Sequence, residues 1–522
     1  MNNRLINTLN INLIPFAIAI VATGCDKKVD ERPNILIVLT DDMGFSDLGC
    51  FGGEIETPNL NALAENGLRF TGFYNTGRCW PTRATLMSGL YSSALSDQQV
   101  TIAEVLKTTG YQTGMVGKWH LGSNPAKSGP ITRGFDRFYG TMGGGGSYWM
   151  PPGLTRDTMF IKPDGEGYYY TDKIGEEAVK QIESFAASDQ PFFQYVAFTA
   201  AHWPIHAPEK TIQKYIARYQ DGWEKLRNDR YSRMLEMGII DQKHWPLPQM
   251  EPNVAKWDTV NHKEWHIRNM AVYAAMVDHM DQAMGHIIDA LKRTNQLDNT
   301  LIVYMHDNGA CSEHVKDNAH GTANNVLAWA EENGKTIAVG DVYDVSMGGP
   351  LTYGTVGHNW ANAQNTPLRR YKANVHEGGA CTPCIMHWPA GMKYKGEITQ
   401  ERGHVVDLMS TCIELAGAKY PSEFNGKPIL KHESLSLVPV IKGGVQPHSQ
   451  CYYFDHNKTQ AVIQGDWKIV RERDNPWQLH NLTENRTETI DLSAEYPDRL
   501  QEMITLFEEW KKLSDTRPKP MK

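Results

Sequence analysis

The sequence predicts an α/β fold in which a large, mostly parallel sheet is flanked by helices, followed by a small C-terminal α+β subdomain. Two patterns support this prediction. Strand-like apolar runs alternate with helix-period runs up to about residue 430, and short two-sided strands follow after that point. The chain of 522 residues also exceeds the roughly 250–300 residues that one hydrophobic core usually holds. We therefore expect two parts, residues 32–430 and residues 431–522.

Four predicted strands of the large sheet each lead into polar or charged side chains. The strands cover residues 34–39, 111–116, 192–198 and 301–305. The side chains that follow them are, in the same order, Asp41 and Asp42, Lys118 and His120, His202 and His206, and Asp307 and Asn308. Because parallel α/β sheets bind ligands outside the carboxyl ends of their strands, we expect these side chains to line one crevice.

Helix-period patterns separate these strands. Apolar residues recur at three- and four-residue spacing in segments 59–66 and 101–109 and, over the greatest length, in segment 269–292. In the C-terminal part we predict strands within residues 452–456, 460–472 and 477–482. A last helix is expected from about residue 497, with one apolar face made of Leu500, Ile504, Phe507 and Trp510.

The N-terminal segment is typical of an export signal. An apolar run from Leu13 to Ala22 is too short to span a membrane, and it leads through small residues to Cys25, as in bacterial lipoproteins. We expect residues 1–24 to be removed, Cys25 to be lipidated and residues 25–31 to form a tether. The protein would then lie in the periplasm or at the cell surface, held to a membrane only by lipid. A plain secretory signal is the alternative.

Charge and cysteine content exclude several classes of protein. The formal charge of −8 and the lack of a basic run argue against nucleic-acid binding, so we expect small or carbohydrate partners. Eight cysteines are too few for a disulfide scaffold in a chain of this length. Cys381 and Cys384 have the spacing of zinc ligands, but no second pair completes a site. A local disulfide or a buried strand end explains them better.

The acidic residues of the predicted crevice favour a hard cation. Asp41, Asp42, Asp307 and Asn308 offer only oxygen ligands, and neighbouring carboxylates repel each other unless a cation lies between them. Ca²⁺ or Mg²⁺ fits this set, whereas zinc and copper do not. Capping of the following helix would explain one acidic pair, but not two pairs at separate strand ends.

Basic residues and histidines complete the predicted crevice. Arg83, Lys118 and Lys372 can donate hydrogen bonds to an oxyanion. His120 and His202 are candidates for proton transfer. Each of these residues alone is commonplace, so the prediction depends on their joint position.

The segment CWPTRATLMSG resembles the sulfatase signature C-x-P-x-R. The chain matches it at Cys79, Pro81 and Arg83, whereas Thr82 stands where serine or alanine is commoner. The segments NILIVLTDDMG, VGKWHLG, AAHWPIHAP, DNG and LRRYKANVHEGG extend the likeness over nearly all of residues 32–417. On these motifs the chain resembles the type I, formylglycine-dependent sulfatases of the alkaline phosphatase-like superfamily, in particular bacterial arylsulfatases.

This resemblance implies that the nucleophile is made after translation. In the family a formylglycine-generating enzyme oxidises the motif cysteine, here Cys79, to Cα-formylglycine (3-oxoalanine), and the aldehyde is hydrated to a diol. One hydroxyl would attack sulfur and displace the alcohol, and deprotonation of the other would expel sulfate. A serine-like nucleophile would instead be trapped as a stable sulfate ester.

The resemblance also implies a role for each crevice residue. The family's metal ligands fall on Asp41, Asp42, Asp307 and Asn308, with Ca²⁺ expected in preference to Mg²⁺. Arg83 would hold the hydrated aldehyde, Lys118 and Lys372 would bind sulfate oxygens, His120 would take the diol proton, and His202 rather than His206 would protonate the leaving oxygen.

The expected activity is hydrolysis of sulfate monoesters, of the arylsulfatase type, with a sulfated polysaccharide or oligosaccharide as natural substrate. Tyr148, Trp149 and Trp203 could stack on sugars, although core packing explains these rings equally well. Two alternatives stay open. One is a phosphonate monoester or phosphodiester hydrolase of the same superfamily, and the other is an inactive surface lipoprotein that binds sulfated glycans.

Overall fold

The computed structural model describes residues 30–91, 94–165, 167–315, 324–447 and 450–517. The predicted signal segment, Cys25 and nearly all of the tether lie outside these residues. The described residues from Arg32 onward form one compact unit. No helix in the described part of the chain combines the length and the apolar character that crossing a membrane requires.

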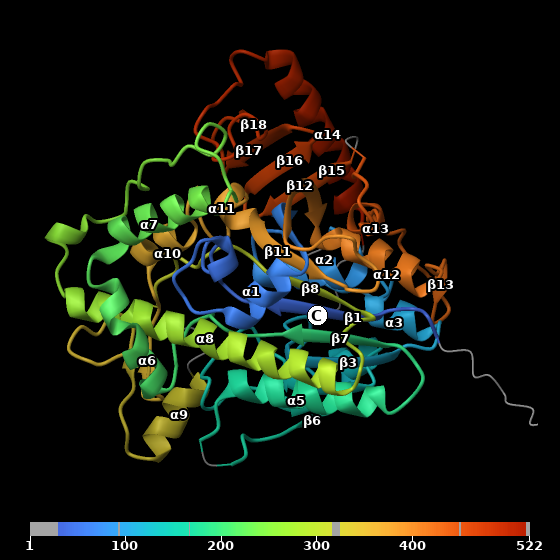
Figure 1. Ribbon diagram of the computed structural model, residues 1–522, viewed down its shortest axis with the longest axis horizontal. Helices are drawn as coiled ribbons and strands as arrows, with labels where there is room; N and C mark the ends of the chain where they lie inside the picture. Colours follow the sequence, from blue (N-terminus) through green and yellow to red (C-terminus); the bar gives the residue numbers. More distant parts are fainter. Residues whose placement is uncertain (1–29, 92–93, 166, 316–323, 448–449, 518–522) are drawn as a thin grey trace, which may run out of the picture. The chain divides into compact units, whose positions relative to one another are not determined.

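A ten-stranded sheet forms the centre of this unit (Figure 1). Its strands, in spatial order, are β12 (Glu397–His404), β2 (Leu68–Tyr74), β11 (Cys381–His387), β8 (Thr300–His306), β1 (Asn34–Thr40), β7 (Phe192–Ala197), β3 (Gln112–Lys118), β4 (Arg137–Thr141), β5 (Leu154–Arg156) and β6 (Met159–Phe160). The run from β8 to β4 is parallel, whereas β11 is antiparallel to both of its neighbours. The predicted mostly parallel sheet is confirmed, and the four predicted strands are β1, β3, β7 and β8.

Helices cover both faces of the sheet (Figure 1). Leu36 and Val38 of β1 pack into a core with α8 (Lys263–Arg293), α5 (Tyr170–Ala186) and α1 (Pro58–Glu65). The alternate residues Ile35 and Ile37 pack on the other face with α2 (Cys79–Ser88), α3 (Ile102–Lys107) and α12 (Leu408–Ala416). Because successive strand residues point to opposite faces, a strand covered on both sides is apolar throughout.

The C-terminal part forms a small antiparallel sheet with a helix, as predicted. Strands β15 (Cys451–His456), β16 (Thr459–Gln464), β17 (Trp467–Glu472) and β18 (Gln478–Asn481) pair in sequence order. Helix α14 (Pro497–Asp515) packs on them through Met503, Phe507 and Trp510, and the Trp510 ring stacks on Tyr453 at 4.8 Å.

Shorter elements fill the connections. They are α4 (Pro125–Ser128), α6 (Glu209–Tyr215), α7 (Gly222–Glu236), α9 (Asn324–Glu332), β9 (Ala338–Val339), β10 (Thr352–Tyr353), α10 (His358–Gln364), α11 (Glu377–Ala380), β13 (Glu423–Phe424), β14 (Lys427–Pro428) and α13 (Val438–Ile441). Cys381 and Cys384 both lie buried in β11 as free thiols, so the buried-strand interpretation of this pair is confirmed.

A buried ion-pair network fixes α7 to the body of the protein. The Arg230 guanidinium is fully buried and donates to Asp47 Oδ1 at 2.6 Å and to Glu54 Oε2 at 2.7 Å. The hydroxyl of Tyr273, on α8, donates to the other oxygen of Asp47 at 2.6 Å. Removing one partner of such a network leaves buried charges without compensation.

We predict that Arg230→Ala lowers the free energy of unfolding by about 3–5 kcal/mol, because Asp47 and Glu54 would lose their counter-ion. Urea denaturation measures the change. Lys225→Ala is the control, since Lys225 forms an exposed pair with Asp229 on the same helix and its loss should change stability little. Equal losses in the two variants would contradict the assignment.

Candidate active site

The crevice at the carboxyl ends of the central strands contains the side chains that follow them. Asp41 and Asp42 follow β1, Asp307 and Asn308 follow β8, Lys118 ends β3, His202 follows β7, Cys79 begins α2 and Lys372 lies in the loop before α11. Each of these side chains is buried. Neighbouring parallel strands end at the same edge, which is why residues distant in sequence meet here.

Each carboxylate in the crevice has a cation or an amide on one side. Asp41 Oδ2 accepts a hydrogen bond from Lys118 Nζ. Asp42 accepts from Lys372 Nζ at 2.8 Å on one oxygen and from Asn308 Nδ2 at 2.8 Å on the other. Asp307 Oδ2 accepts from the Arg83 guanidinium at 2.7 Å. The cluster therefore combines three acids with three buried cations.

Three oxygen atoms in the same cluster have no donor among the described residues. They are Asp41 Oδ1, Asp307 Oδ1 and Asn308 Oδ1, and all are buried. Ligand atoms of Asp41, Asp307 and Cys79 lie within 4.8 Å of one another, as do those of Asp41, Asp42 and His202. Buried polar atoms normally have partners, so these oxygens fit a hard cation.

Burial and neighbouring charges shift the pKa values of the crevice acids. Burial raises the pKa of Asp307 to about 7, and the charge of Asp41 acts in the same direction. Burial also opposes ionisation of Asp41, but the charges of Lys118 and its neighbours outweigh burial and lower the pKa of Asp41. A cation among these carboxylates would favour the ionised form of both.

The two crevice histidines are neutral near pH 7. Burial lowers the pKa of His202 to about 4, with Lys372 acting in the same direction. Its Nδ1 lies 2.6 Å from the carbonyl oxygen of Trp203, so Nδ1 carries the proton, and Nε2 lies 3.6 Å from Asp42 Oδ2. Burial also lowers the pKa of His120 far below its ordinary value, and no described residue partners its Nδ1.

His206 lies outside the crevice. Its Nδ1 accepts from the backbone N–H of Tyr148 at 3.4 Å, and its Nε2 donates to the carbonyl oxygen of Thr352 at 2.6 Å. Tyr148 is also structural, because it is 1% exposed and its hydroxyl donates to the carbonyl oxygens of Thr199 and His202. The core-packing interpretation therefore applies to Tyr148.

Hydrogen bonds to the ends of β3 and β8 fix the residues of the signature motif. Arg83 is fully buried, and its Nη1 donates to the Lys118 carbonyl at 2.9 Å while Nη2 donates to Asp307. The Thr82 hydroxyl donates to the carbonyl oxygen of Asp307 at 2.7 Å and accepts from the backbone N–H of Thr76 at 3.0 Å. Threonine at this unusual position thus ties the start of α2 to the end of β8.

The structure adds Glu313 to the crevice, which the sequence did not single out. Its carboxylate pairs with Arg78 at 2.6 Å, lies 3.5 Å from Lys372 Nζ and accepts from Trp203 Nε1 at 3.1 Å. Burial opposes ionisation of Glu313, yet the charges of Lys372 and Arg78 lower its pKa to about 2. The only sequence signal was the position of Arg78, directly before Cys79.

The C-terminal sheet also reaches the crevice. The ring of His456, at the end of β15, lies 5.4 Å from the indole of Trp80, and that indole lies 5.9 Å from His120. The Arg78 guanidinium lies over the same indole at 5.1 Å. Nothing in the local sequence of β15 indicated this contact, because it arises only from tertiary packing.

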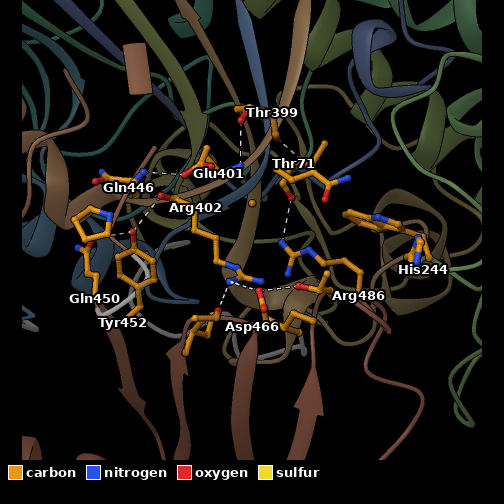
Figure 2. A pocket seen from close by; sticks show the side chains of 18 of the residues that line it. Thr71, His244, Thr399, Glu401, Arg402, Gln446, Gln450, Tyr452, Asp466 and Arg486 are labelled. Carbon is orange, nitrogen blue, oxygen red and sulfur yellow. Dashed lines mark hydrogen bonds and ion pairs between the residues drawn. The ribbon is translucent and has the colours of Figure 1, made fainter. Parts of the chain in front are cut away.

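A separate polar cavity of about 500 Å³ lies between edge strand β12, strand β2 and the C-terminal sheet. Figure 2 shows Arg402 in this cavity with Tyr452 and Gln450 on one side and Arg486 on the other. None of the predicted site residues lines it. The cavity therefore lies apart from the crevice.

Comparison with known proteins decides the family. The family model described as Sulfatase matches residues 33–418. The chain belongs to the sulfatase family. It is 32% identical over 454 residues to an arylsulfatase of Klebsiella aerogenes, which covers 80% of this chain and 94% of that protein. An uncharacterised sulfatase of Schizosaccharomyces pombe is 30% identical over 524 residues, covering 91% and 92% of the two chains. The protein is thus a sulfuric ester hydrolase.

Solved structures confirm the alkaline phosphatase-like α/β fold. The structure of Ps i-CgsB in complex with k-i-k-neocarrahexaose is 25% identical, covers 92% of each chain and superposes with a TM-score of 0.64. The structure of BT4656 in complex with D-glucosamine-2-N,6-O-disulfate is 21% identical, with a TM-score of 0.59 and coverage of 93% and 99%. The second likeness concerns the fold alone.

Proposed function

We propose that this enzyme hydrolyses sulfate monoesters of carbohydrates, using a formylglycine made from Cys79 and one bound Ca²⁺. The observation that carries the proposal is the meeting of Cys79 with buried oxygens that lack donors, at the shared end of β1 and β8. Two lysines and an arginine surround the same point. Export and lipidation at Cys25 belong to the same proposal and would bring the enzyme to extracellular polymers.

The donor set fits a calcium ion better than a softer metal. Asp41, Asp42, Asp307 and Asn308 would hold the ion, and three of their oxygens have no other partner among the described residues. All four ligands are oxygen donors, which suits Ca²⁺ and Mg²⁺. When bound, the cation would neutralise charge on the sulfate oxygens and on the nucleophile.

The basic residues would bind and orient the sulfate group. Lys118 and Lys372 each contact one carboxylate of the proposed metal site, which would hold their ammonium groups beside the cation, within reach of sulfate oxygens. Arg83 is fixed by the Lys118 carbonyl and Asp307, which suits it to hold the hydrated side chain at position 79. The hydrated aldehyde would supply a nucleophile that can release sulfate after attack.

The histidines would move the protons. His120 is neutral and its Nδ1 has no partner among the described residues, so this atom can accept the proton of the nucleophile. His202 donates through Nδ1 to the carbonyl of Trp203, which leaves Nε2 facing the crevice. The negative charge of a bound sulfate ester would favour protonation of Nε2 as well, and the doubly protonated ring would pass this Nε2 proton to the leaving oxygen of the alcohol.

The preference for sugars is supported by the relatives. N-acetylgalactosamine-6-sulfatase of Homo sapiens is 26% identical over 501 residues, and the solved Ps i-CgsB structure holds a neocarrahexaose. Glu313 and the partly exposed Trp203 at the crevice offer a carboxylate and an indole to a sugar. An aryl sulfate has no sugar hydroxyls to be recognised, and its leaving group needs no strong general acid. We therefore regard its hydrolysis as a side activity.

We predict that His202→Ala reduces kcat/KM on a sugar sulfate by about 10²–10⁴-fold and on nitrophenyl sulfate by less than about tenfold. A sugar alkoxide leaves poorly without a proton, whereas nitrophenolate leaves readily. Steady-state kinetics on both substrates measures the difference. His286→Ala, on the exposed face of α8, is the control. Equal losses on the two substrates would remove His202 from this role.

The proposed function is tested by comparing kcat/KM on matched aryl sulfate and aryl phosphonate monoesters, and on a panel of sulfated oligosaccharides from algal and animal glycans. We expect the sulfate to be preferred, because two lysines and one cation suit a monoanionic ester. Preference for the phosphonate would favour the alternative hydrolase. Failure to release sulfate from any oligosaccharide would contradict the carbohydrate assignment.

A further inference from the structure

Two adjoining cavities open beside the crevice and share Arg370 and Glu472. The first, of about 500 Å³, is also lined by Lys372, Asn374 and Ser312. The second, of about 330 Å³, is also lined by Arg369, Arg471 and His376. The two cavities adjoin at the Arg370–Glu472 ion pair, and we call them together the arginine groove.

The groove starts at the crevice. Lys372, which donates to Asp42, lines the first cavity and lies two residues after Arg370. Ser312 and His314 line the same cavity and flank Glu313, whose carboxylate lies 3.5 Å from Lys372 Nζ. The first cavity therefore extends from Lys372 at the crevice to Glu472, on β17 of the C-terminal sheet.

Two guanidinium groups at the far end have no carboxylate partner in the described part of the chain. Arg369 donates through Nη1 to the carbonyl oxygen of Glu488. Arg471, on β17, donates through Nε to Gln460 Oε1 at 2.6 Å and lies over the Trp477 ring at 4.5 Å. Neutral acceptors and a ring thus fix their orientation while their charges stay available.

The other charged groups of the groove are already engaged. Arg370 pairs with Glu472 at 2.7 Å and with Glu251 at 3.0 Å. Asp491 Oδ1 accepts from the backbone N–H groups of Leu479 and Ser493. The lining of the second cavity has three arginines against Glu472 and Asp491, which leaves one excess positive charge in a chain whose formal charge is −8.

We propose that the arginine groove binds a neighbouring part of the substrate chain and that Arg369 and Arg471 hold a second sulfate group on it. The proposal rests on the proposed function and refines it, because the substrate becomes a carbohydrate chain with at least two sulfates. Guanidinium groups pair with tetrahedral oxyanions through two parallel hydrogen bonds, which gives geometric selection as well as charge.

Binding is measured in the inactive Cys79→Ser background, so that turnover does not interfere. The probes are carrageenan- and heparin-derived hexasaccharides carrying several sulfates, each compared with the same hexasaccharide desulfated to one sulfate. We expect the polysulfated probe of at least one type to bind more tightly than its partner. Arg471→Gln and Arg369→Gln should each raise its Kd about ten- to a hundredfold and leave the Kd of the monosulfated probe unchanged.

Arg402→Gln is the matched control. Arg402 is also a partly exposed arginine at the junction with the C-terminal sheet, but it lies in the separate cavity of Figure 2, beside Asp466. Its substitution should leave both Kd values unchanged. In otherwise unmodified enzyme, Arg471→Gln and Arg369→Gln should leave kcat/KM on nitrophenyl sulfate unchanged, because this substrate carries no second sulfate.

Two results would overturn the proposal. One is equal affinity of the polysulfated and monosulfated probes of both types, and the other is an equal rise in Kd from Arg402→Gln. Turnover of the wild-type enzyme on the same oligosaccharides is read separately. Sulfate release without any preference for polysulfated chains would reject sulfate binding in the arginine groove but leave the proposed function intact. Tight binding of polysulfated chains without sulfate release would reject the proposed function but leave sulfate binding in the groove intact.

Discussion

Cys79→Ser is expected to reduce kcat on nitrophenyl sulfate by about a thousandfold or more, with little change in melting temperature. The side chain at position 79 is 3% exposed, and its sulfur lies within 4.8 Å of carboxylate oxygens of Asp41 and Asp307. Serine fills nearly the same space, so the fold should persist. An unoxidised serine hydroxyl, however, lacks the second hydroxyl of the aldehyde hydrate, so it would keep the sulfate as a stable ester.

Steady-state kinetics and thermal unfolding measure the two effects. The control is Cys451→Ser, which changes a cysteine on β15 that lies outside the crevice and should retain activity. Near-normal turnover by Cys79→Ser would contradict the assigned nucleophile. A comparable loss in both variants would indicate a general effect of removing a thiol.

Asp307→Ala is expected to lower both the bound calcium and kcat, the latter on the order of a hundredfold or more. Asp307 Oδ1 is one of the buried oxygens without a donor in the described residues, and Oδ2 orients Arg83. The substitution would thus remove a metal ligand and release the arginine. Elemental analysis by mass spectrometry gives the calcium content, and kinetics gives kcat.

The matched control for this variant is Asp278→Ala, because Asp278 is another buried aspartate but contacts Lys214 and Tyr215 outside the crevice. It should keep the metal even if stability falls. Full activity after exhaustive chelation of the wild-type enzyme would contradict a catalytic cation. Unchanged calcium content in Asp307→Ala would exclude Asp307 as a ligand.

Four central strands of the sheet could be predicted because they are buried on both faces. The run NILIVL became β1, and the polar residues after it lie at its carboxyl end. Two of the other strands show why prediction failed outside this centre. Strand β12 is a partly exposed edge strand with mixed polarity, and β11 contains Pro383, where its pairing with β2 shifts register. Such strands lack the apolar run that marks a buried strand.

The crevice residues were accessible from the sequence because strand ends of a parallel sheet converge. Glu313 and His456 could not be predicted from the sequence. Glu313 lies in a loop near Lys372, and His456 lies at a strand end near Trp80, and both contacts depend on packing between distant segments. His206 shows that a position close to a crevice residue in the sequence does not place a side chain in the crevice. It lies four residues after His202, yet its ring is fixed in the core by Tyr148 and Thr352.

The central claim is that Cys79 acts only after conversion to formylglycine, and mass spectrometry of the peptide spanning residue 79 tests it most directly. The protein is produced with and without a formylglycine-generating enzyme, and activity on nitrophenyl sulfate is measured on the same samples. We expect the aldehyde or its hydrate at residue 79, in a fraction that rises in proportion to activity. Full activity in a sample whose peptide carries only unmodified cysteine would contradict the account, and an unconverted, inactive protein in both samples would favour a glycan-binding lipoprotein.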